Sequence, residues 1–410
     1  MIAVVGAGAA GLMAAIHAAR SGARVLVIER TPDGGKKILI SGGGRCNVLP
    51  AEVDPTRFVT ASSPNTLRLM LRRWPLEQQR AFFETDLGIP LAFESESGKL
   101  FPASNRARDV RDGLVAAAKR AGATFRTTST VTDVSPIASG WRVGFAVGEP
   151  IIATKVILAT GGLSVPQTGS DGIGLGIARR LGIPINPTYP ALTPLLADPP
   201  VHADLAGLSL DVELTARVAG KRRVARGGFL FTHRGYSGPA VLDLSDVVCR
   251  SVLEQAPRPD LVVRWAPALD REGWSARLQA QSGRRVASVV RQELPDRLAD
   301  RLLHEAAVGQ TVELAQLTRE ARHRLLDQLT AYLLPWTGDE GYRKAEVTGG
   351  GVALEGVDPL TLQSRTRPGL FLCGEILDAF GPIGGHNFAW AWATGRSAGR
   401  AAAGAPEAAR

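Results

Sequence analysis

The chain has 410 residues, 45% of them apolar and 21% charged, which is typical of a globular enzyme with two or three domains. Its net charge of 48 − 39 = +9 fits either a polyanionic partner or a composition simply rich in arginine. Cys46, Cys249 and Cys373 lie far apart, which excludes a disulfide framework or metal-ligand spacing and predicts a reducing cytoplasm. We predict neither a signal peptide nor a membrane span, because no basic leader, cleavage site or long uncharged apolar stretch is present.

The N-terminal stretch has the pattern of a dinucleotide-binding unit. A β-branched run at Ile2–Val5 is followed by GAGAAG and then by the helical sequence LMAAIHAAR. Gly6 permits a tight turn, Gly8 the approach of a pyrophosphate, and Gly11 the close packing of helix and strand. A second buried strand ends at Glu29, where a carboxylate can accept both ribose hydroxyls. The carboxylate disfavours a 2′-phosphate, so we expect FAD or NAD rather than NADP.

The next segment, residues 31–47, favours FAD over NAD. An NAD dehydrogenase usually continues with a second strand–helix unit, whereas this chain makes a glycine- and lysine-rich loop that contains KKILISGGGRCN. Gly42–Gly44 let the backbone approach the flavin or the phosphates, Arg45 supplies positive charge, and Asn47 can donate to a ring carbonyl. Cys46 is expected either to give a proton beside the flavin or, as the favoured alternative, to pack as a small residue.

Two later stretches are expected to join the same site. VILATGGLSVPQTGSDGIG (156–174) is typical of a buried strand followed by a loop that returns to the cofactor. Residues 367–400 predict a buried strand, a turn containing Gly384–Gly385, and a helix that begins near Asn387. A helix N-terminus aimed at the flavin would stabilise the negative charge that builds on reduction, and Glu375 is suited to hold a ribityl or ribose hydroxyl.

A cofactor domain built from both chain ends implies an insertion between them. The fold class is α/β, with a Rossmann-type FAD-binding domain, an inserted β-barrel-like domain and a small helical domain. Alternating apolar and polar residues over 208–245, with turns at Ala219-Gly220 and Gly227-Gly228, predict the antiparallel strands of the insert. The predicted boundaries are 1–189 plus 346–410 for the FAD domain, with a helical interruption at 54–120, 190–250 plus about 311–345 for the β-rich insert, and 251–310 for the helical insert.

Four motifs in order, GKKILISGGGRCN, ATGGLSVPQTGSDGIG, FLFTHRGYSGPAVLDLS and GE…GGHN, make the chain resemble the BaiN/RdsA-type flavoproteins over nearly its whole length. Members of this family are often described as aminoacetone-oxidase-like or NAD(P)/FAD-dependent oxidoreductases. The resemblance implies FAD as cofactor, and NAD(P)H, where used, would bind briefly over the flavin. It implies reduction of carbon–carbon double bonds, in steroids or in ribosomal RNA uridines, without choosing between them. Ala389 departs from the family pattern, in which a glutamine commonly follows the residue at Phe388.

The motifs and the resemblance together give the candidate site residues. The expected FAD-binding residues are Gly6, Gly8, Ala9, Ala10, Gly11, Glu29, Arg30, Lys37, Gly42, Gly43, Gly44, Arg45, Cys46, Asn47, Val131, Ala159, Thr160, Gly161, Gly374, Glu375, Gly384, Gly385, Asn387 and Phe388. The candidate proton donors are Cys46, His233, Tyr236 and His386. His233 is the best acid by its ordinary pKa, although its segment is equally well explained as a polar hairpin turn. His386 would be either an acid beside the flavin or a helix cap.

Two groups of basic residues lie in the insert, where they would either bind ribosomal RNA phosphates or form solvated faces. They are Arg217, Lys221, Arg222, Arg223 and Arg226 around a hairpin, and Arg284, Arg285, Arg291, Arg297 and Arg301 in the helical part. Three functions follow: an FAD-dependent reductase of an unsaturated ring, with ribosomal RNA uridine as the sharpest substrate; a flavin oxidase or dehydrogenase acting on a small amine, steroid or other metabolite; and a non-catalytic, flavin-containing RNA-binding protein.

Overall fold

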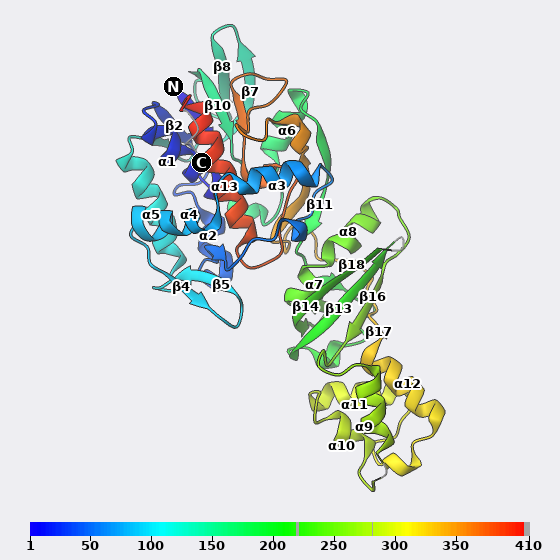
Figure 1. Ribbon diagram of the computed structural model, residues 1–410. Coiled ribbons are helices and arrows are strands. Elements are labelled where there is room, and N and C mark those ends of the chain that lie inside the picture. Colours follow the sequence, from blue (N-terminus) through cyan, green and yellow to red (C-terminus); the bar gives the residue numbers. More distant parts are fainter. Residues whose placement is uncertain (219–220, 281, 406–410) are drawn as a thin grey trace. The chain divides into compact units, whose positions relative to one another are not determined.

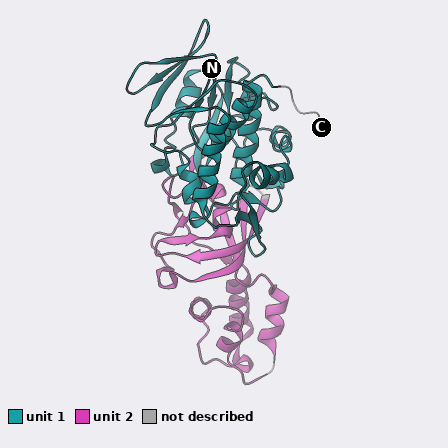
Figure 2. Cartoon of the chain, turned by 90° about the vertical axis from the view of Figure 1, so that its left-hand side faces the viewer, with its two compact units in different colours: residues 1–190, 345–410 teal, residues 191–344 magenta. Residues whose placement is uncertain are grey.

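The chain folds into two compact units, each with its own hydrophobic core (Figure 1, Figure 2). The computed structural model describes residues 1–218, 221–280 and 282–405. Unit 1 is formed by residues 1–190 and 345–410, and unit 2 by residues 191–344. Among the described residues, no helix has the length and apolar character needed to cross a membrane.

A five-stranded parallel sheet forms the centre of unit 1. Its strands, in spatial order, are β20 (Leu370–Leu372), β10 (Lys155–Leu158), β1 (Ile2–Val5), β2 (Val25–Ile28) and β6 (Thr124–Arg126). Most of their residues are buried, which explains why the first, second and last of these strands along the chain are continuous apolar runs. The parallel order brings the C-terminal β20 beside β10, which in turn pairs with the N-terminal β1.

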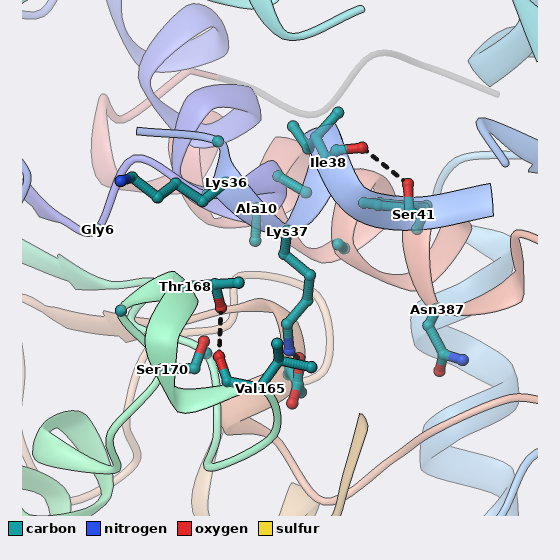
Figure 3. Close-up of a pocket in the computed structure, with 18 of the residues that line it drawn as sticks. Gly6, Ala10, Lys36, Lys37, Ile38, Ser41, Val165, Thr168, Ser170 and Asn387 are labelled. Atoms are coloured by element: carbon teal, nitrogen blue, oxygen red, sulfur yellow. Dashed lines mark hydrogen bonds and ion pairs between the residues drawn. The ribbon is translucent and has the colours of Figure 1, made fainter. Parts of the chain in front are cut away.

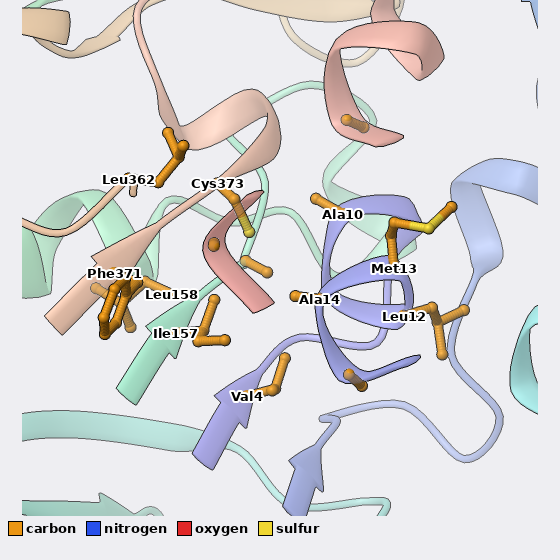
Figure 4. Packing of buried hydrophobic residues seen from close by; sticks show 14 of the residues in the cluster. Val4, Ala10, Leu12, Met13, Ala14, Ile157, Leu158, Leu362, Phe371 and Cys373 are labelled. Carbon is orange, nitrogen blue, oxygen red and sulfur yellow. The ribbon is translucent and has the colours of Figure 1, made fainter. Parts of the chain in front are cut away.

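Two helices from opposite ends of the chain pack directly against each other in unit 1. They are α1 (Ala9–Arg20) and α13 (His386–Ala402). A Cβ atom on Gly395 would overlap the backbone carbonyl of Ala10, and one on Gly399 would overlap that of Ala14. The helices therefore approach backbone to backbone, and Figure 4 shows the apolar side chains of α1 and the sheet that pack beside this contact.

The other elements of unit 1 cover the sheet and extend its loops. They are α2 (Lys36–Ile40), β3 (Leu49–Pro50), α3 (Pro64–Arg72), α4 (Leu76–Ala81), β4 (Leu91–Glu94), β5 (Lys99–Pro102), α5 (Ala107–Arg120), β7 (Val131–Ile137), β8 (Gly140–Phe145), β9 (Ile151–Ala153), α6 (Ile173–Arg180), β11 (Ile185–Ala191) and β19 (Val347–Val352). The interruption at 54–120 contains the predicted helices, but β4 and β5 also form a hairpin within it. These strands are only four residues long, so their pattern is too short to distinguish from a turn.

A seven-stranded antiparallel sheet forms the β-rich part of unit 2, in the order β17-β16-β13-β14-β15-β12-β18. The strands are β12 (Leu195–Leu196), β13 (Ser209–Val218), β14 (Lys221–Phe231), β15 (Gly235–Ser237), β16 (Asp260–Arg264), β17 (Tyr332–Leu333) and β18 (Gly338–Asp339). The predicted insert is thus one sheet, and the pairings among the described residues do not join its edges into a closed barrel.

One of the two predicted hairpin turns is wrong. Gly227 and Gly228 lie inside β14, where they pair with Val212 and Asp211 of β13. A Cβ atom on Gly228 would lie 3.4 Å from Pro239 Cδ, so the small residues accommodate a close neighbour rather than a reversal of the chain. The other predicted turn, Ala219-Gly220, lies outside the described residues.

The helices of unit 2 shift the predicted insert boundaries. They are α7 (Pro239–Leu242), α8 (Ser245–Leu253), α9 (Arg271–Gln279), α10 (Val286–Val290), α11 (Asp296–Glu305) and α12 (Arg319–Thr330). The range 251–310, predicted to be helical, also contains the strand β16, and the range 311–345, assigned to the β-rich insert, contains α12. A five-residue strand between two helical segments leaves a weak periodic signal, and its identity as a strand comes from pairing with β13.

We predict that Gly395→Ala destabilises the protein, because its methyl group would meet backbone atoms of α1 that cannot move independently. The expected loss is about 1–3 kcal/mol in the free energy of unfolding, measured by urea denaturation. Gly176→Ala in α6 is the matched control, since its new methyl group would lie 3.6 Å from Arg180 Nη1 and the helix propensity of alanine favours it. Equal stability of the two variants would contradict the backbone-to-backbone contact.

Candidate active site

The loop between β1 and α1 has the shape of a phosphate cradle. Gly6 has φ +103°, and a Cβ atom there would lie 2.5 Å from the carbonyl oxygen of Ala159. A Cβ atom on Gly11 would overlap the carbonyl of Gly6, whereas one on Gly8 would meet no atom within 4 Å. Other backbone atoms therefore crowd Gly6 and Gly11, whereas the space beside Gly8 is empty. At Gly8 the N-terminus of α1 offers free amide groups.

Glu29 follows β2 and is held in place by the same loop region. Its Oε2 accepts a hydrogen bond from the Ala7 amide at 2.7 Å, and its Oε1 accepts from the amide and hydroxyl of Thr31, both at 2.8 Å. A carboxylate can accept about four hydrogen bonds, so a ribose hydroxyl can still be accommodated. The buried carboxylate lines the cavity described next.

A cavity of about 560 Å³ lies within unit 1, lined by the β1–α1 loop, the segment after α2, the loop after β10 and the start of α13 (Figure 3). Its lining includes these predicted FAD-binding residues: Gly6, Gly8, Ala9, Ala10, Glu29, Arg30, Lys37, Gly42, Gly43, Arg45, Asn47, Val131, Ala159, Thr160, Gly161, Glu375, Gly384, Gly385, Asn387 and Phe388. Gly11, Gly44, Cys46 and Gly374 do not line it. Segments far apart in sequence thus meet around one cavity of cofactor size.

The segment 36–47 is more ordered than a simple loop, because α2 and a tight 3₁₀ turn occupy most of it. The three consecutive glycines Gly42, Gly43 and Gly44 all have positive φ, at +55°, +66° and +86°. A residue with a side chain rarely adopts a positive φ, and three such residues in succession would be strongly disfavoured. The glycines are therefore needed for the path of the backbone as well as for close approach to a ligand.

Cys46 and Asn47 follow this turn and point to different environments. Cys46 is fully buried, and burial raises the pKa of its thiol to about 12. It does not line the cavity, so its position agrees with a packed residue rather than a proton donor. Asn47 does line the cavity, and its Oδ1 is buried without a hydrogen-bond partner among the described residues. A donor on a bound ligand would satisfy this oxygen.

Arg45 is fixed against the β4–β5 hairpin. Its Nη1 lies 2.9 Å from Glu94 Oε1, and its guanidinium carbon lies 3.9 Å from the centroid of the Phe101 ring. The ion pair and the stacked ring orient the guanidinium, which still lines the cavity.

A polar network joins the N-terminal and C-terminal parts of the lining. Lys37 Nζ lies 2.7 Å from Glu375 Oε2 and 2.6 Å from Ser164 Oγ, and Ser164 Oγ donates to Glu375 Oε1 at 2.6 Å. Thr348 Oγ1 donates to the same Glu375 oxygen and accepts from the amide of Leu163 at 2.7 Å. Glu375 is thus already engaged by Lys37, and the network fixes the two segments against each other.

The turn before α13 brings the backbone close to other segments. Gly385 has φ +96°, and its Cβ atom would lie 2.6 Å from the carbonyl carbon of Leu49. Asn387 closes the turn by accepting from the Gly381 amide at 2.9 Å and donating to its carbonyl at 3.0 Å. His386 is buried outside the lining, and burial together with Arg57 lowers its pKa to about 4. A histidine with this pKa is neutral at pH 7 and has no proton to give as an imidazolium.

The other two candidate donors belong to unit 2 and not to this lining. His233 is exposed on the turn between β14 and β15. Tyr236 is fully buried, contrary to the exposed turn expected for its segment, and its hydroxyl lies 2.8 Å from Nδ1 of His202. The other ring nitrogen of His202 lies 2.9 Å from the Tyr332 hydroxyl. Burial raises the pKa of Tyr236 above its ordinary value, and these contacts make it part of the core.

The lining residues fit FAD in shape, donor groups and charge. The open position at Gly8 can admit a diphosphate, and the unpartnered Asn47 Oδ1 can accept from a ring N–H group. The charged lining residues are Arg30, Lys36, Lys37, Arg45 and Lys99 against Glu29, Glu346 and Glu375. The lining itself carries 5 − 3 = +2, and two of its cations also pair with carboxylates outside it, Arg30 with Asp171 and Arg45 with Glu94.

Several lining residues are absent from the sequence-based set. They are Lys36, Ser41, Lys99, Phe101, Ser129, Thr130, Thr168, Ser170, Glu346, Cys373 and Trp390. Lys99 and Phe101 reach the cavity through the β4–β5 hairpin, and Ser129 and Thr130 directly precede the predicted Val131. Lys36, Ser41, Thr168 and Ser170 lie within two of the sequence motifs, GKKILISGGGRCN and ATGGLSVPQTGSDGIG. No local motif marks Lys99, Phe101, Ser129 and Thr130, because their place in the lining arises from tertiary contacts.

Comparisons with known proteins show the family to which the chain belongs. The family model described as HI0933-like protein Rossmann domain matches residues 1–401. A protein of Escherichia coli (strain K12) named ribosomal RNA dihydrouridine synthase is 33% identical over 396 residues, covering 95% of each chain. A protein of Clostridium scindens named 3-dehydro-bile acid delta(4,6)-reductase is 32% identical over 412 residues, covering 99% of each chain.

Solved structures share the fold at lower sequence identity. A 3-ketosteroid-delta4-(5alpha)-dehydrogenase from Rhodococcus jostii RHA1 has a TM-score of 0.52 and 16% identity, covering 98% of this chain and 96% of that chain. A flavocytochrome c3 fumarate reductase has a TM-score of 0.51 and 18% identity, covering 98% of this chain and 78% of that chain. Since the family model and both relatives span almost the whole sequence, the chain belongs to the HI0933-like Rossmann family of BaiN/RdsA type and is an FAD-dependent oxidoreductase.

Proposed function

We propose that this protein is an NAD(P)H-driven reductase of a carbon–carbon double bond conjugated to a carbonyl group, and that it converts uridine to dihydrouridine in ribosomal RNA. NAD(P)H is oxidised, one carbon of the double bond receives a hydride, and the other receives a proton. The observation that carries the proposal is the cavity of unit 1, whose lining fits FAD. We place the reaction in the cytoplasm, where the three free, buried cysteines would stay reduced.

The two full-length relatives support a common type of chemistry. Dihydrouridine is uridine with its ring double bond reduced, and that bond is conjugated to a carbonyl group. The name 3-dehydro-bile acid delta(4,6)-reductase likewise describes reduction of double bonds conjugated to a ketone. Both names therefore imply the same change in different substrates, which is why we propose the reaction type first and the ribosomal RNA substrate second.

The chain's own residues would bind and orient the cofactor. Bound FAD supplies the hydride-transfer chemistry. The open backbone at Gly8 and the N-terminus of α1 would hold the diphosphate, and Glu29 the ribose hydroxyls. The stacked guanidinium of Arg45 and the Lys37–Glu375 ion pair would hold hydrogen-bonding groups at fixed places on the lining.

We propose that the proton comes from the lining of the unit 1 cavity rather than from the four candidates named from the sequence. None of Cys46, His233, Tyr236 and His386 lines the cavity. The lining does carry the ammonium groups of Lys36, Lys37 and Lys99 and the hydroxyls of Ser41 and Ser170. We propose that one of these groups, or water held by them, delivers the proton.

A second candidate is reduction of a small unsaturated ketone such as a steroid. The similarity to the bile acid reductase favours it, because that alignment covers 99% of both chains. The two candidates share the FAD site and differ in whether ribosomal RNA or a small molecule is turned over.

We predict that Gly8→Ala weakens FAD binding without destabilising the FAD-free protein. The new methyl group meets no protein atom within 4 Å but would occupy the space of the diphosphate. A cost of about 1–3 kcal/mol corresponds to roughly five- to 140-fold lower affinity, measured by titrating the FAD-free protein with FAD. Gly338→Ala, at an equally open glycine of β18 outside the lining, is the control. Unchanged FAD affinity in Gly8→Ala would place the diphosphate elsewhere.

The decisive test of the proposed function is the dihydrouridine content of ribosomal RNA from cells with and without the gene. We expect one site to lose dihydrouridine in the deletion strain, and purified FAD-loaded protein with NADH or NADPH to restore it. Unchanged content, combined with NAD(P)H-dependent reduction of an unsaturated 3-ketosteroid, would instead establish the second candidate.

A further inference from the structure

Three neighbouring strands of the unit 2 sheet, β16, β13 and β14, carry arginines on the face opposite the core. Direct pairing places Arg226 and Arg264 on either side of Glu213, and Arg222 and Asp260 on either side of Arg217. Directly paired residues point to the same side of a sheet, and side chains two residues apart on a strand share that side. Arg217, Arg222, Arg226 and Arg264 therefore form one surface, which we call the arginine face.

Only some of the basic residues singled out in the sequence lie on the arginine face. Arg223 lies on the other side of the sheet, where it pairs with the buried Asp246 of α8. In the helical part, Arg291 pairs with Asp300, and Arg301 pairs with Asp204. The side chain of Lys221 lies outside the described part of the chain. The arginine face is thus narrower than the predicted cluster, and it includes Arg264, which sequence analysis did not single out.

One buried carboxylate organises three of these arginines. Arg226 Nη2 lies 2.7 Å from Glu213 Oε2, Arg264 Nη2 lies 3.1 Å from the same oxygen, and Arg222 Nη2 lies 3.6 Å from Oε1. The Glu213 side chain is 9% exposed, whereas those of Arg222 and Arg226 are 62% and 72% exposed. The buried carboxylate contacts all three guanidiniums, and it leaves those of Arg222 and Arg226 largely open to solvent, whereas the Arg264 side chain is only 24% exposed.

The arginine face keeps a positive excess. Its four arginines share that side of the sheet with three carboxylates, Asp211, Glu213 and Asp260, which gives 4 − 3 = +1. Arg217 and Arg222 stand directly opposite each other, an arrangement of like charges that costs stability in an isolated sheet. Each guanidinium has five N–H donors, more than Glu213 can accept, so donors remain for an external anion.

We propose that the arginine face binds phosphodiester groups of the RNA backbone, with Glu213 as a positioning residue that holds the guanidiniums in orientation. This inference rests on the proposed function, because ribosomal RNA is the polyanion that the protein would meet. Arginine forks match phosphate geometry with two parallel hydrogen bonds, and their value depends on orientation as well as on charge.

The test compares two variants that each remove one negative charge from the arginine face. If the arginines act only as independent charges, Glu213→Gln and Asp260→Asn should both tighten RNA binding. If Glu213 orients them, Glu213→Gln should weaken binding roughly three- to tenfold, while Asp260→Asn leaves it equal or tighter. The FAD-loaded protein is titrated with protein-free total ribosomal RNA, and thermal melting without RNA checks that each variant is folded. Tighter binding by Glu213→Gln would overturn the positioning role.

A second pair of variants tests the surface itself. Arg222→Gln combined with Arg226→Gln should lower the affinity and reduce the salt slope by about 0.7–0.9 for each phosphate that the protein no longer neutralises. Arg226→Lys keeps the positive charge but removes the paired N–H donors of the guanidinium. It should therefore weaken RNA binding with little change in the salt dependence of the affinity. An unchanged affinity and slope in the double variant would show that RNA docks elsewhere, and equal competition by heparin would overturn RNA as the specific partner.

The outcomes separate this inference from the proposed function. If RNA binding by the double variant falls as expected but the wild-type protein forms no dihydrouridine, the RNA-binding role of the arginine face is supported and the reductase proposal fails. If dihydrouridine is formed equally well by the wild-type protein and by the double variant, the reductase proposal stands and the arginine face is overturned.

Discussion

The contact between α1 and α13 is the constraint on which the cofactor site depends. Gly395 and Gly399 allow the C-terminal helix to lie against the backbone of Ala10 and Ala14, so the two ends of the chain share one core. Both helices then begin at the same cavity, with Ala9 at one N-terminus and Asn387 near the other. Helix N-termini carry partial positive charge and free amides, which suit an anionic cofactor. The contact between the two helices thereby decides where the anion-binding groups lie.

The segment 36–47 completes this arrangement and explains an unusual run of residues. Its three glycines follow a left-handed path that residues with side chains would resist, and the path ends with Asn47 on the cavity and Cys46 in the core. Lys37 then reaches across to Glu375, which ties the segment to the C-terminal half. Residues of this one short stretch therefore have different structural roles. The glycines reverse the backbone, Cys46 packs in the core, Asn47 offers a polar contact, and Lys37 links two distant segments.

Much of unit 1 can be predicted from local pattern, because GAGAAG, Glu29 and the buried apolar strands each impose a recognisable sequence requirement. The pattern at the C-terminus predicts a helix from near Asn387, and the helix begins at His386. Other features depend on contacts between residues distant in sequence. Lys99 joins the lining only because the β4–β5 hairpin folds toward it, and Tyr236 is buried because His202 supplies a hydrogen-bond partner. The strand β16 is not predicted for the same reason, since β14, β15, α7 and α8 separate it in sequence from its partner β13.

The central claim is that three separated segments of unit 1 form one FAD site. Hydrogen–deuterium exchange of the protein with and without FAD tests this most directly. We expect FAD to protect amides in the β1–α1 loop, in residues 36–47 and at the start of α13 together, and to leave β13 and β14 unchanged. Protection confined to the β1–α1 loop, with no change in the other two segments, would contradict a site assembled from both ends of the chain.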